Sequence, residues 1–205
     1  KILRDFEGDP ASMEEVRGTV ASIIQHVRAE GDRALVELTR KLDKADIDAA
    51  SLKVDAGEME EALATLDREE VKLIQQAQAQ VSDFHEKTLP KDWTARNRDG
   101  ALVGERYYPL ESVGLYIPGG SVPLVSSVLM SATLARIAGN PRIVAVTPPL
   151  PDGTISPGML AALRLCEVSE VYRVGGAQAI AALAYGTDSI APVQKVFGPG
   201  NAYVL

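Results

Sequence analysis

Three glycine-rich turns follow apolar runs in the second half of the chain, and each brings a ligand within reach of the backbone. The turns are Ile117-Pro118-Gly119-Gly120, Gly175-Gly176 and Phe197-Gly198-Pro199-Gly200-Asn201. Glycine has no Cβ, so a bound molecule can approach the main chain closely at such a turn. The alanine-rich run after Gly176 predicts a helix whose free N–H groups and positive dipole end face that molecule. The pattern predicts a nucleotide-sized site at the edge of a parallel sheet.

The runs around these turns predict strands that alternate with helices. Strands are expected at 113–117, 142–147, 170–174 and 193–197. Helices are expected between them at 126–138, 157–168 and 177–185. The strands begin 29, 28 and 23 residues apart, close to the length of one β-α-β unit, so the sheet is expected to be parallel. Parallel strands bind ligands beyond their carboxyl ends, where the glycine turns fall.

The first half of the chain reads as helices followed by a hairpin. A capping box at Ser12 to Glu15 predicts a helix that ends at Gly31, and Asp32 is expected to cap the next one. A third helix is expected from about Asp67 to Thr88, and residues 93–108 predict a hairpin that turns at Asp99-Gly100.

Charge divides the chain into two parts. Residues 1–105 carry 23 acidic and 15 basic side chains, whereas residues 106–205 carry 5 and 6. We therefore expect a helical N-terminal region with the strand hairpin at 1–112, as part of a first domain, and a nucleotide-binding domain at 113–205. The expected class is α/β.

Composition excludes several kinds of partner. The net charge of −7 argues against a nucleic-acid or anionic-membrane surface. No apolar run approaches the roughly 20 residues of a membrane span. The single cysteine, Cys166, permits no intramolecular disulfide and is consistent with a reducing compartment, so a cytoplasmic location is expected.

The chain offers few residues for catalysis or metal binding. His26 and His85 lie on separate expected helices without a second histidine or cysteine nearby, which favours structural roles. Ser126-Ser127 is expected to cap a helix, because no histidine or carboxylate lies near it in sequence to activate a nucleophile. We expect no catalytic residue and no metal ligand in this chain. The nucleotide motifs GxGxxG and GxxxxGK[ST] are also absent.

Five motifs, taken in order, resemble the histidinol dehydrogenase family. They are Val113 to Gly120, Ser127-Val128-Leu129-Met130, Thr147-Pro148-Pro149, Val174 to Ala182 and Phe197 to Val204. The resemblance spans nearly the whole chain; at Gln194-Lys195 the family more often has an acidic residue before the lysine. It implies a homodimer of incomplete Rossmann-like domains that oxidises L-histidinol through the aldehyde to L-histidine, with two NAD and a bound zinc, in histidine biosynthesis.

The resemblance assigns NAD contacts to Tyr116, Gln178 and Asn201, beside Gly175 and Gly176. An aromatic hydroxyl and two neutral amides next to glycine backbone suit a dinucleotide. Each side chain also has a structural interpretation. Tyr116 would be a core residue, Gln178 a polar residue of a first helical turn, and Asn201 a helix cap.

The resemblance also implies that the zinc ligands and a Glu-His acid–base pair lie beyond Leu205. The chain is then the N-terminal part of the enzyme and is expected to be inactive alone. Two alternatives remain open: a dehydrogenase of the same scaffold for another small alcohol, and a non-catalytic nucleotide-binding module. The downstream sequence would separate them.

Overall fold

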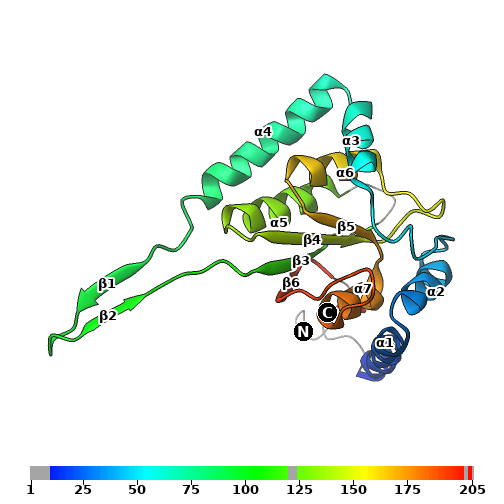
Figure 1. The fold of residues 1–205 in the computed structure, drawn as a ribbon, viewed down its shortest axis with the longest axis horizontal. Coiled ribbons are helices and arrows are strands. Elements are labelled where there is room, and N and C mark those ends of the chain that lie inside the picture. Colours follow the sequence, from blue (N-terminus) through cyan, green and yellow to red (C-terminus); the bar gives the residue numbers. More distant parts are fainter. Residues whose placement is uncertain (1–9, 120–123, 201–202, 205) are drawn as a thin grey trace, which may run out of the picture.

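The computed structural model describes residues 10–119, 124–200 and 203–204, which form a parallel sheet covered by helices on both faces (Figure 1). The N-terminal elements are α1 (Pro10–Glu30), α2 (Asp32–Leu42), α3 (Ala56–Thr65), α4 (Arg68–His85), β1 (Trp93–Arg96) and β2 (Leu102–Glu105). The remaining elements are β3 (Ser112–Tyr116), α5 (Val125–Ile137), β4 (Arg142–Thr147), α6 (Pro157–Leu165), β5 (Glu170–Arg173), α7 (Gly176–Tyr185) and β6 (Lys195–Phe197).

Four strands form the central sheet in the order β5-β4-β3-β6, and all neighbouring pairs are parallel. This confirms the predicted alternation of strand and helix. The chain steps from β3 to β4 to β5 in one direction and then returns past β3 to β6. The connections after β3 and before β6 therefore leave in opposite directions. This reversal opens a crevice at the carboxyl ends of the two strands, where α/β sheets bind ligands.

Alternate side chains of the strands enter two separate cores, as a sheet buried on both faces requires. Val113, Leu115 and Ile143 pack with residues of α3, α5 and α6 on one face. Val144 and Val146 pack with residues of α1, α2 and α7 on the other. The N-terminal helices thus contribute to both cores beside the sheet.

The segment between α2 and α3 is tied to β5 by main-chain and side-chain hydrogen bonds. The Val54 N–H donates to Val171 at 2.9 Å, and the Arg173 N–H donates to Leu52 at 2.8 Å. The Arg173 guanidinium is buried and donates to the carbonyl of Ser51 at 3.0 Å and to the Glu58 carboxylate. These contacts hold the segment between α2 and α3 against β5 at the edge of the sheet. The division at residue 112 stays a prediction.

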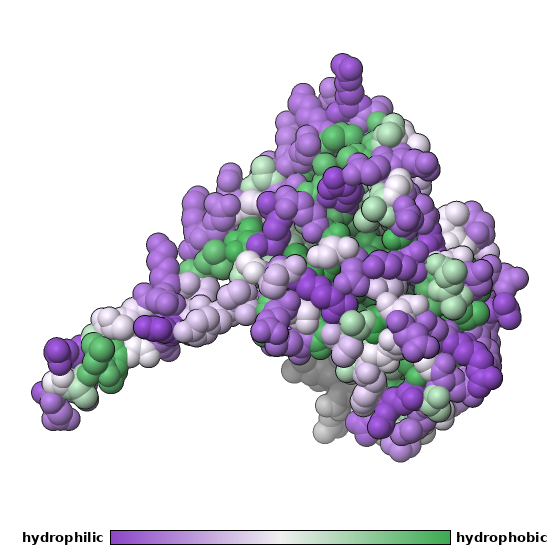
Figure 2. All heavy atoms as spheres, viewed as in Figure 1, coloured by the Kyte–Doolittle hydropathy of each residue, from purple (hydrophilic) through white to green (hydrophobic). Residues whose placement is uncertain are grey.

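The hairpin β1–β2 projects from the body as an arm, beyond the end of α4 (Figure 1). The predicted hairpin is confirmed, with antiparallel pairing from Trp93↔Glu105 to Arg96↔Leu102. All eight strand residues are exposed, and α4 has no fully buried residue. Apolar side chains such as Leu102 and Tyr108 lie in contact with solvent, and Figure 2 shows hydrophobic colour near the tip of this arm.

Three predicted caps are wrong, because each of these helices begins at or before the residue that was expected to cap it. The first helix begins at Pro10, so Ser12 lies inside it. Asp32 is the first residue of α2, behind an N-cap at Gly31, and its carboxylate accepts hydrogen bonds from Ser189. The N-cap of α5 is Leu124, which places Ser126-Ser127 within the first turn.

One helix was not predicted from the sequence. It is α3, which begins with a capping box formed by Asp55 and Glu58. Among the described residues, no helix is long and apolar enough to cross a membrane.

Candidate functional site

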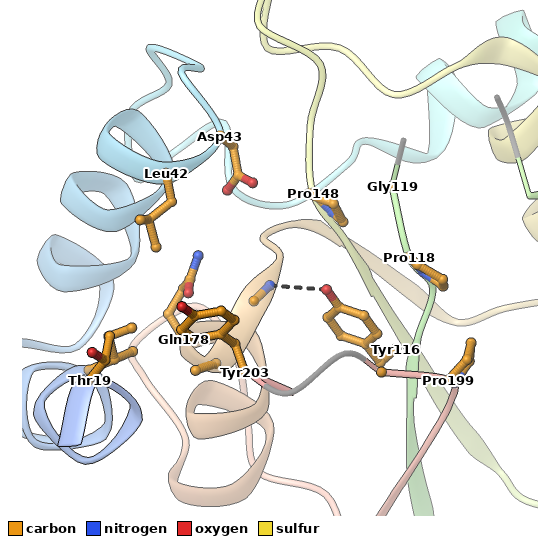
Figure 3. Close-up of a pocket in the computed structure, with 14 residues that line it drawn as sticks. Thr19, Leu42, Asp43, Tyr116, Pro118, Gly119, Pro148, Gln178, Pro199 and Tyr203 are labelled. Carbon is orange, nitrogen blue, oxygen red and sulfur yellow. Dashed lines mark hydrogen bonds between the residues drawn. The ribbon is translucent and has the colours of Figure 1, made fainter. Parts of the chain in front are cut away.

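A cavity of about 590 Å³ lies at the carboxyl ends of the parallel strands, at the reversal of strand order (Figure 3). Every strand of the sheet contributes to it, through its last residue or through the turn that follows. Its walls also include α1 and the end of α2. The described lining residues are Thr19, Ile23, Leu42, Asp43, Tyr116, Pro118, Gly119, Pro148, Gly176, Ala177, Gln178, Pro199, Gly200 and Tyr203. The glycine turns singled out in the sequence therefore meet in one place.

Tyr116 is the last residue of β3, and its ring reaches across the cavity toward the start of α7 (Figure 3). Its hydroxyl oxygen accepts a hydrogen bond of 3.1 Å from the Gly176 N–H. Burial raises the pKa of this hydroxyl, so the group keeps its proton at neutral pH. The hydroxyl hydrogen is then free to be donated to a bound molecule, because the Gly176 bond uses only the oxygen.

The turn before α7 has space only for glycine. Gly176 has a φ of +61°, and a Cβ there would lie 2.7 Å from Oε1 of Gln178. At Gly175, the N-cap of α7, a Cβ would lie 2.5 Å from the ring of Pro148. Both glycines are therefore in close contact with other parts of the protein, and the predicted approach of a ligand to their backbone stays a prediction. Gly176 lines the cavity, whereas Gly175 supports it from behind by packing against Pro148.

Gln178 lies in the first turn of α7 and is only 1% exposed. Both of its amide atoms, Oε1 and Nε2, are buried, and neither has a hydrogen-bond partner among the described residues. A buried amide without partners costs free energy, so such a group is expected to serve a polar ligand or an ordered water. Gln178 also lines the cavity, so its amide is a candidate ligand-binding group.

Asp43 is a cavity residue that sequence reasoning missed. It follows the last residue of α2, and its Oδ2 atom is buried without a hydrogen-bond partner among the described residues. Burial raises the pKa of Asp43 to about 6, and its charge contributes to raising the pKa of Tyr116. The nearby Lys44 directs its ammonium group to the carbonyl of Lys41 at 2.8 Å. Nothing in the local pattern distinguishes Asp43 from the exposed carboxylates near it.

Asn201, the third predicted contact, lies outside the described residues, and its role stays a prediction. Its neighbours Pro199 and Gly200 line the cavity. Tyr203, which follows in the chain, contributes an aromatic ring to the same space (Figure 3).

The cavity contains groups suited to a dinucleotide and too few to hold zinc. Its described lining offers one carboxylate, that of Asp43, and includes no histidine or cysteine. A zinc site needs at least three such ligands, so these residues do not fit the metal. An unpartnered amide, two tyrosines and the start of a helix do fit a molecule that carries hydroxyls, rings and phosphates.

A possible metal-ligand cluster lies on the helices instead. His26, Glu30 and Glu37 present ligand atoms within 4.8 Å of one another. The guanidinium of Arg33 lies 2.7 Å from the Glu30 carboxylate and supplies the positive charge there. We therefore interpret this cluster as an ion-pair network, which agrees with the structural role expected for His26.

Comparisons with known proteins agree on one family. A profile described as histidinol dehydrogenase matches residues 8–205. Histidinol dehydrogenase from Geobacillus kaustophilus is 49% identical over 191 residues, and that from Bacillus subtilis is 46% identical over 194. These alignments cover 93% and 95% of this chain and 45% of each relative, so the chain spans about half their length.

A solved structure gives the same result for the fold. The crystal structure of histidinol dehydrogenase from Elizabethkingia anophelis matches with a TM-score of 0.87 at 35% identity, over 92% of this chain and 43% of that one. Sequence and structure together show that the chain belongs to the histidinol dehydrogenase family.

Proposed function

We propose that this chain provides the NAD-binding part of a histidinol dehydrogenase, which oxidises L-histidinol through the aldehyde to L-histidine. The observation that supports it is the unpartnered amide of Gln178, which lines the cavity at the point where the strand order reverses. The family membership supplies the reaction, and the alternatives of another small alcohol or a non-catalytic module have no observation in their favour.

Each lining group has a defined task in this proposal. The Gln178 amide donates to and accepts from polar groups of the dinucleotide, while the Tyr116 hydroxyl donates its free hydrogen. The start of α7 faces the pyrophosphate with its positive dipole end, since Gly176 places no side chain in the cavity there. The prolines that line the cavity exclude water beside the bound molecule. Asn201 is the third polar contact. NAD, when bound, supplies the hydride acceptor.

We assign the zinc ligands and the proton-transfer groups to the part of the family sequence that follows residue 205. The described cavity lining has one carboxylate, so no step that requires a metal is assigned to it. We also propose that the complete protein is a homodimer. The exposed apolar side chains of the β1–β2 arm support this, because a projecting hydrophobic surface is typical of an interface.

Two measurements test the proposed function. Calorimetric titration should show NAD binding to the chain, and a full-length protein that carries residues 1–205 should reduce NAD when L-histidinol is added. The chain alone should bind no stoichiometric zinc and show no histidinol-dependent NAD reduction. Absence of NAD binding in both proteins, or histidinol oxidation by the chain alone, would contradict the proposal. A panel of other small alcohols given to the full-length protein tests the substrate.

A further inference from the structure

Asp43 is placed to contact a different part of the ligand from the part that faces α7. The residue comes from the end of α2, whereas Tyr116 and Gln178 come from the sheet and from α7. In Figure 3 its carboxylate points into the cavity from the side opposite the Tyr116 strand. The Oδ2 atom is buried without a partner among the described residues, as are both amide atoms of Gln178. The same cavity thus contains two separate unpartnered polar groups.

The chemistry of a carboxylate limits what it can recognise. An ionised carboxylate accepts hydrogen bonds and donates none, so its natural partners in a nucleotide are hydroxyl groups. The two hydroxyls of a ribose match its two oxygens, and an acidic side chain serves this purpose in many dinucleotide sites. A phosphate in the same place would put negative charge against negative charge, with no cation among the described lining residues to offset it.

We propose that Asp43 is a specificity-determining residue that accepts hydrogen bonds from a ribose diol of the dinucleotide and excludes a 2′-phosphorylated one. The inference rests on the proposed function, because it concerns the same cavity. It adds the basis on which the site separates NAD from NADP. The strand that follows β3, β4, ends at Thr147 and is followed by Pro148-Pro149, so no acidic residue stands at the end of a second strand, where such a residue usually binds the ribose. Asp43, at the end of α2, is the residue to which we assign that role.

The electrostatic surroundings of Asp43 support this role. Burial raises the pKa of its carboxyl group to about 6, so the carboxylate is ionised at neutral pH but poorly solvated. The basic side chain nearest in sequence, Lys44, donates a hydrogen bond to the Lys41 carbonyl. A carboxylate kept in this state gains from a hydroxyl donor and is strongly unfavourable beside a phosphate.

The test compares NAD and NADP binding in a full-length protein that carries this chain, with Asp43→Asn, Asp43→Glu and a control. Asp46→Asn is the matched control, since Asp46 lies three positions away and its exposed carboxylate pairs with Arg40 at 2.6 Å. We expect unchanged protein to bind NAD at least tenfold more tightly than NADP. Asp43→Asn should reduce that ratio at least fivefold, whereas Asp43→Glu and Asp46→Asn should preserve it. Thermal melting confirms that each variant is folded.

The outcomes separate this inference from the proposed function. If unchanged protein binds NAD and Asp43→Asn keeps the original NAD-to-NADP ratio, the role of Asp43 is overturned and the proposed function stands. Equal affinity of unchanged protein for NAD and NADP would also overturn the role of Asp43 and leave the proposed function standing. If unchanged protein binds neither dinucleotide, the proposed function fails and the inference fails with it. If Asp43→Asn does not fold, Asp43→Glu decides, because loss of selectivity with the charge retained contradicts the inference.

Discussion

Gln178→Met is the sharpest test of the binding site, because it should move stability and affinity in opposite directions. The substitution replaces a buried amide with an apolar side chain of similar length. In the structure both amide atoms are buried and neither has a hydrogen-bond partner among the described residues. Removing them removes a desolvation penalty that the folded protein otherwise carries.

The expected sizes follow from those two atoms. An unsatisfied buried donor or acceptor costs about 1–3 kcal/mol, and an imperfect fit of the new side chain costs up to about 1.5 kcal/mol. We expect a net gain near 1 kcal/mol, which raises the melting temperature of a protein of this size by about 2–4 °C. Loss of one or two hydrogen bonds to NAD, at about 1 kcal/mol each, weakens binding by roughly 5- to 30-fold.

The assay is thermal melting without ligand together with calorimetric titration of NAD. Gln78→Met is the matched control, because Gln78 lies on α4 away from the cavity and its Nε2 donates to the Leu165 carbonyl at 3.2 Å. That variant should lower the melting temperature and leave NAD affinity unchanged. A Gln178→Met protein that melts lower than the original and binds NAD equally well would refute the reasoning.

Three further predictions concern the glycines and Asp43. Gly176→Val, at a φ of +61° with 2.7 Å from its Cβ to Gln178, should raise the Michaelis constant of the full-length enzyme for NAD more than that for histidinol; equal increases would count against it. Gly114→Ala would place its Cβ 2.8 Å from Leu183 and 3.1 Å from Val193, so denaturant unfolding should show a loss of about 1–3 kcal/mol, and unchanged stability would contradict that packing. The pKa of Asp43, raised by burial to about 6 from 3.8, means that the folded chain binds this proton more tightly than the unfolded chain. Stability should therefore fall as pH rises from about 4 to 6. The only other titratable groups in the described lining are tyrosine hydroxyls, so Asp43→Asn should be more stable than the unchanged protein above pH 6, by roughly 1 kcal/mol after solvent screening. A difference in melting temperature between the two proteins that does not change with pH would exclude this.

Local sequence determined the order of strands and helices in the second half of the chain. Glycine and proline interrupt the apolar runs at similar intervals, and β4 lies at the predicted residues. Tyr116 at the end of β3 and Gln178 in the first turn of α7 were also placed correctly, because strand ends and helix starts depend on neighbouring residues. The NAD contacts themselves stay predictions.

Tertiary structure alone decided how these pieces meet. Asp43 lies 73 residues before Tyr116 in sequence, and no local pattern joins them, yet packing of α2 against the sheet brings both into one cavity. The same packing buries Gln178 and leaves its amide without a partner among the described residues, which is a property of the surroundings rather than of the residue. Long-range packing also lets the Asp32 carboxylate accept a hydrogen bond from the Ser189 hydroxyl, 157 residues away in sequence. Periodicity reports which face of an element is buried, but the identity of the opposing surface follows only from the long-range packing of the whole chain.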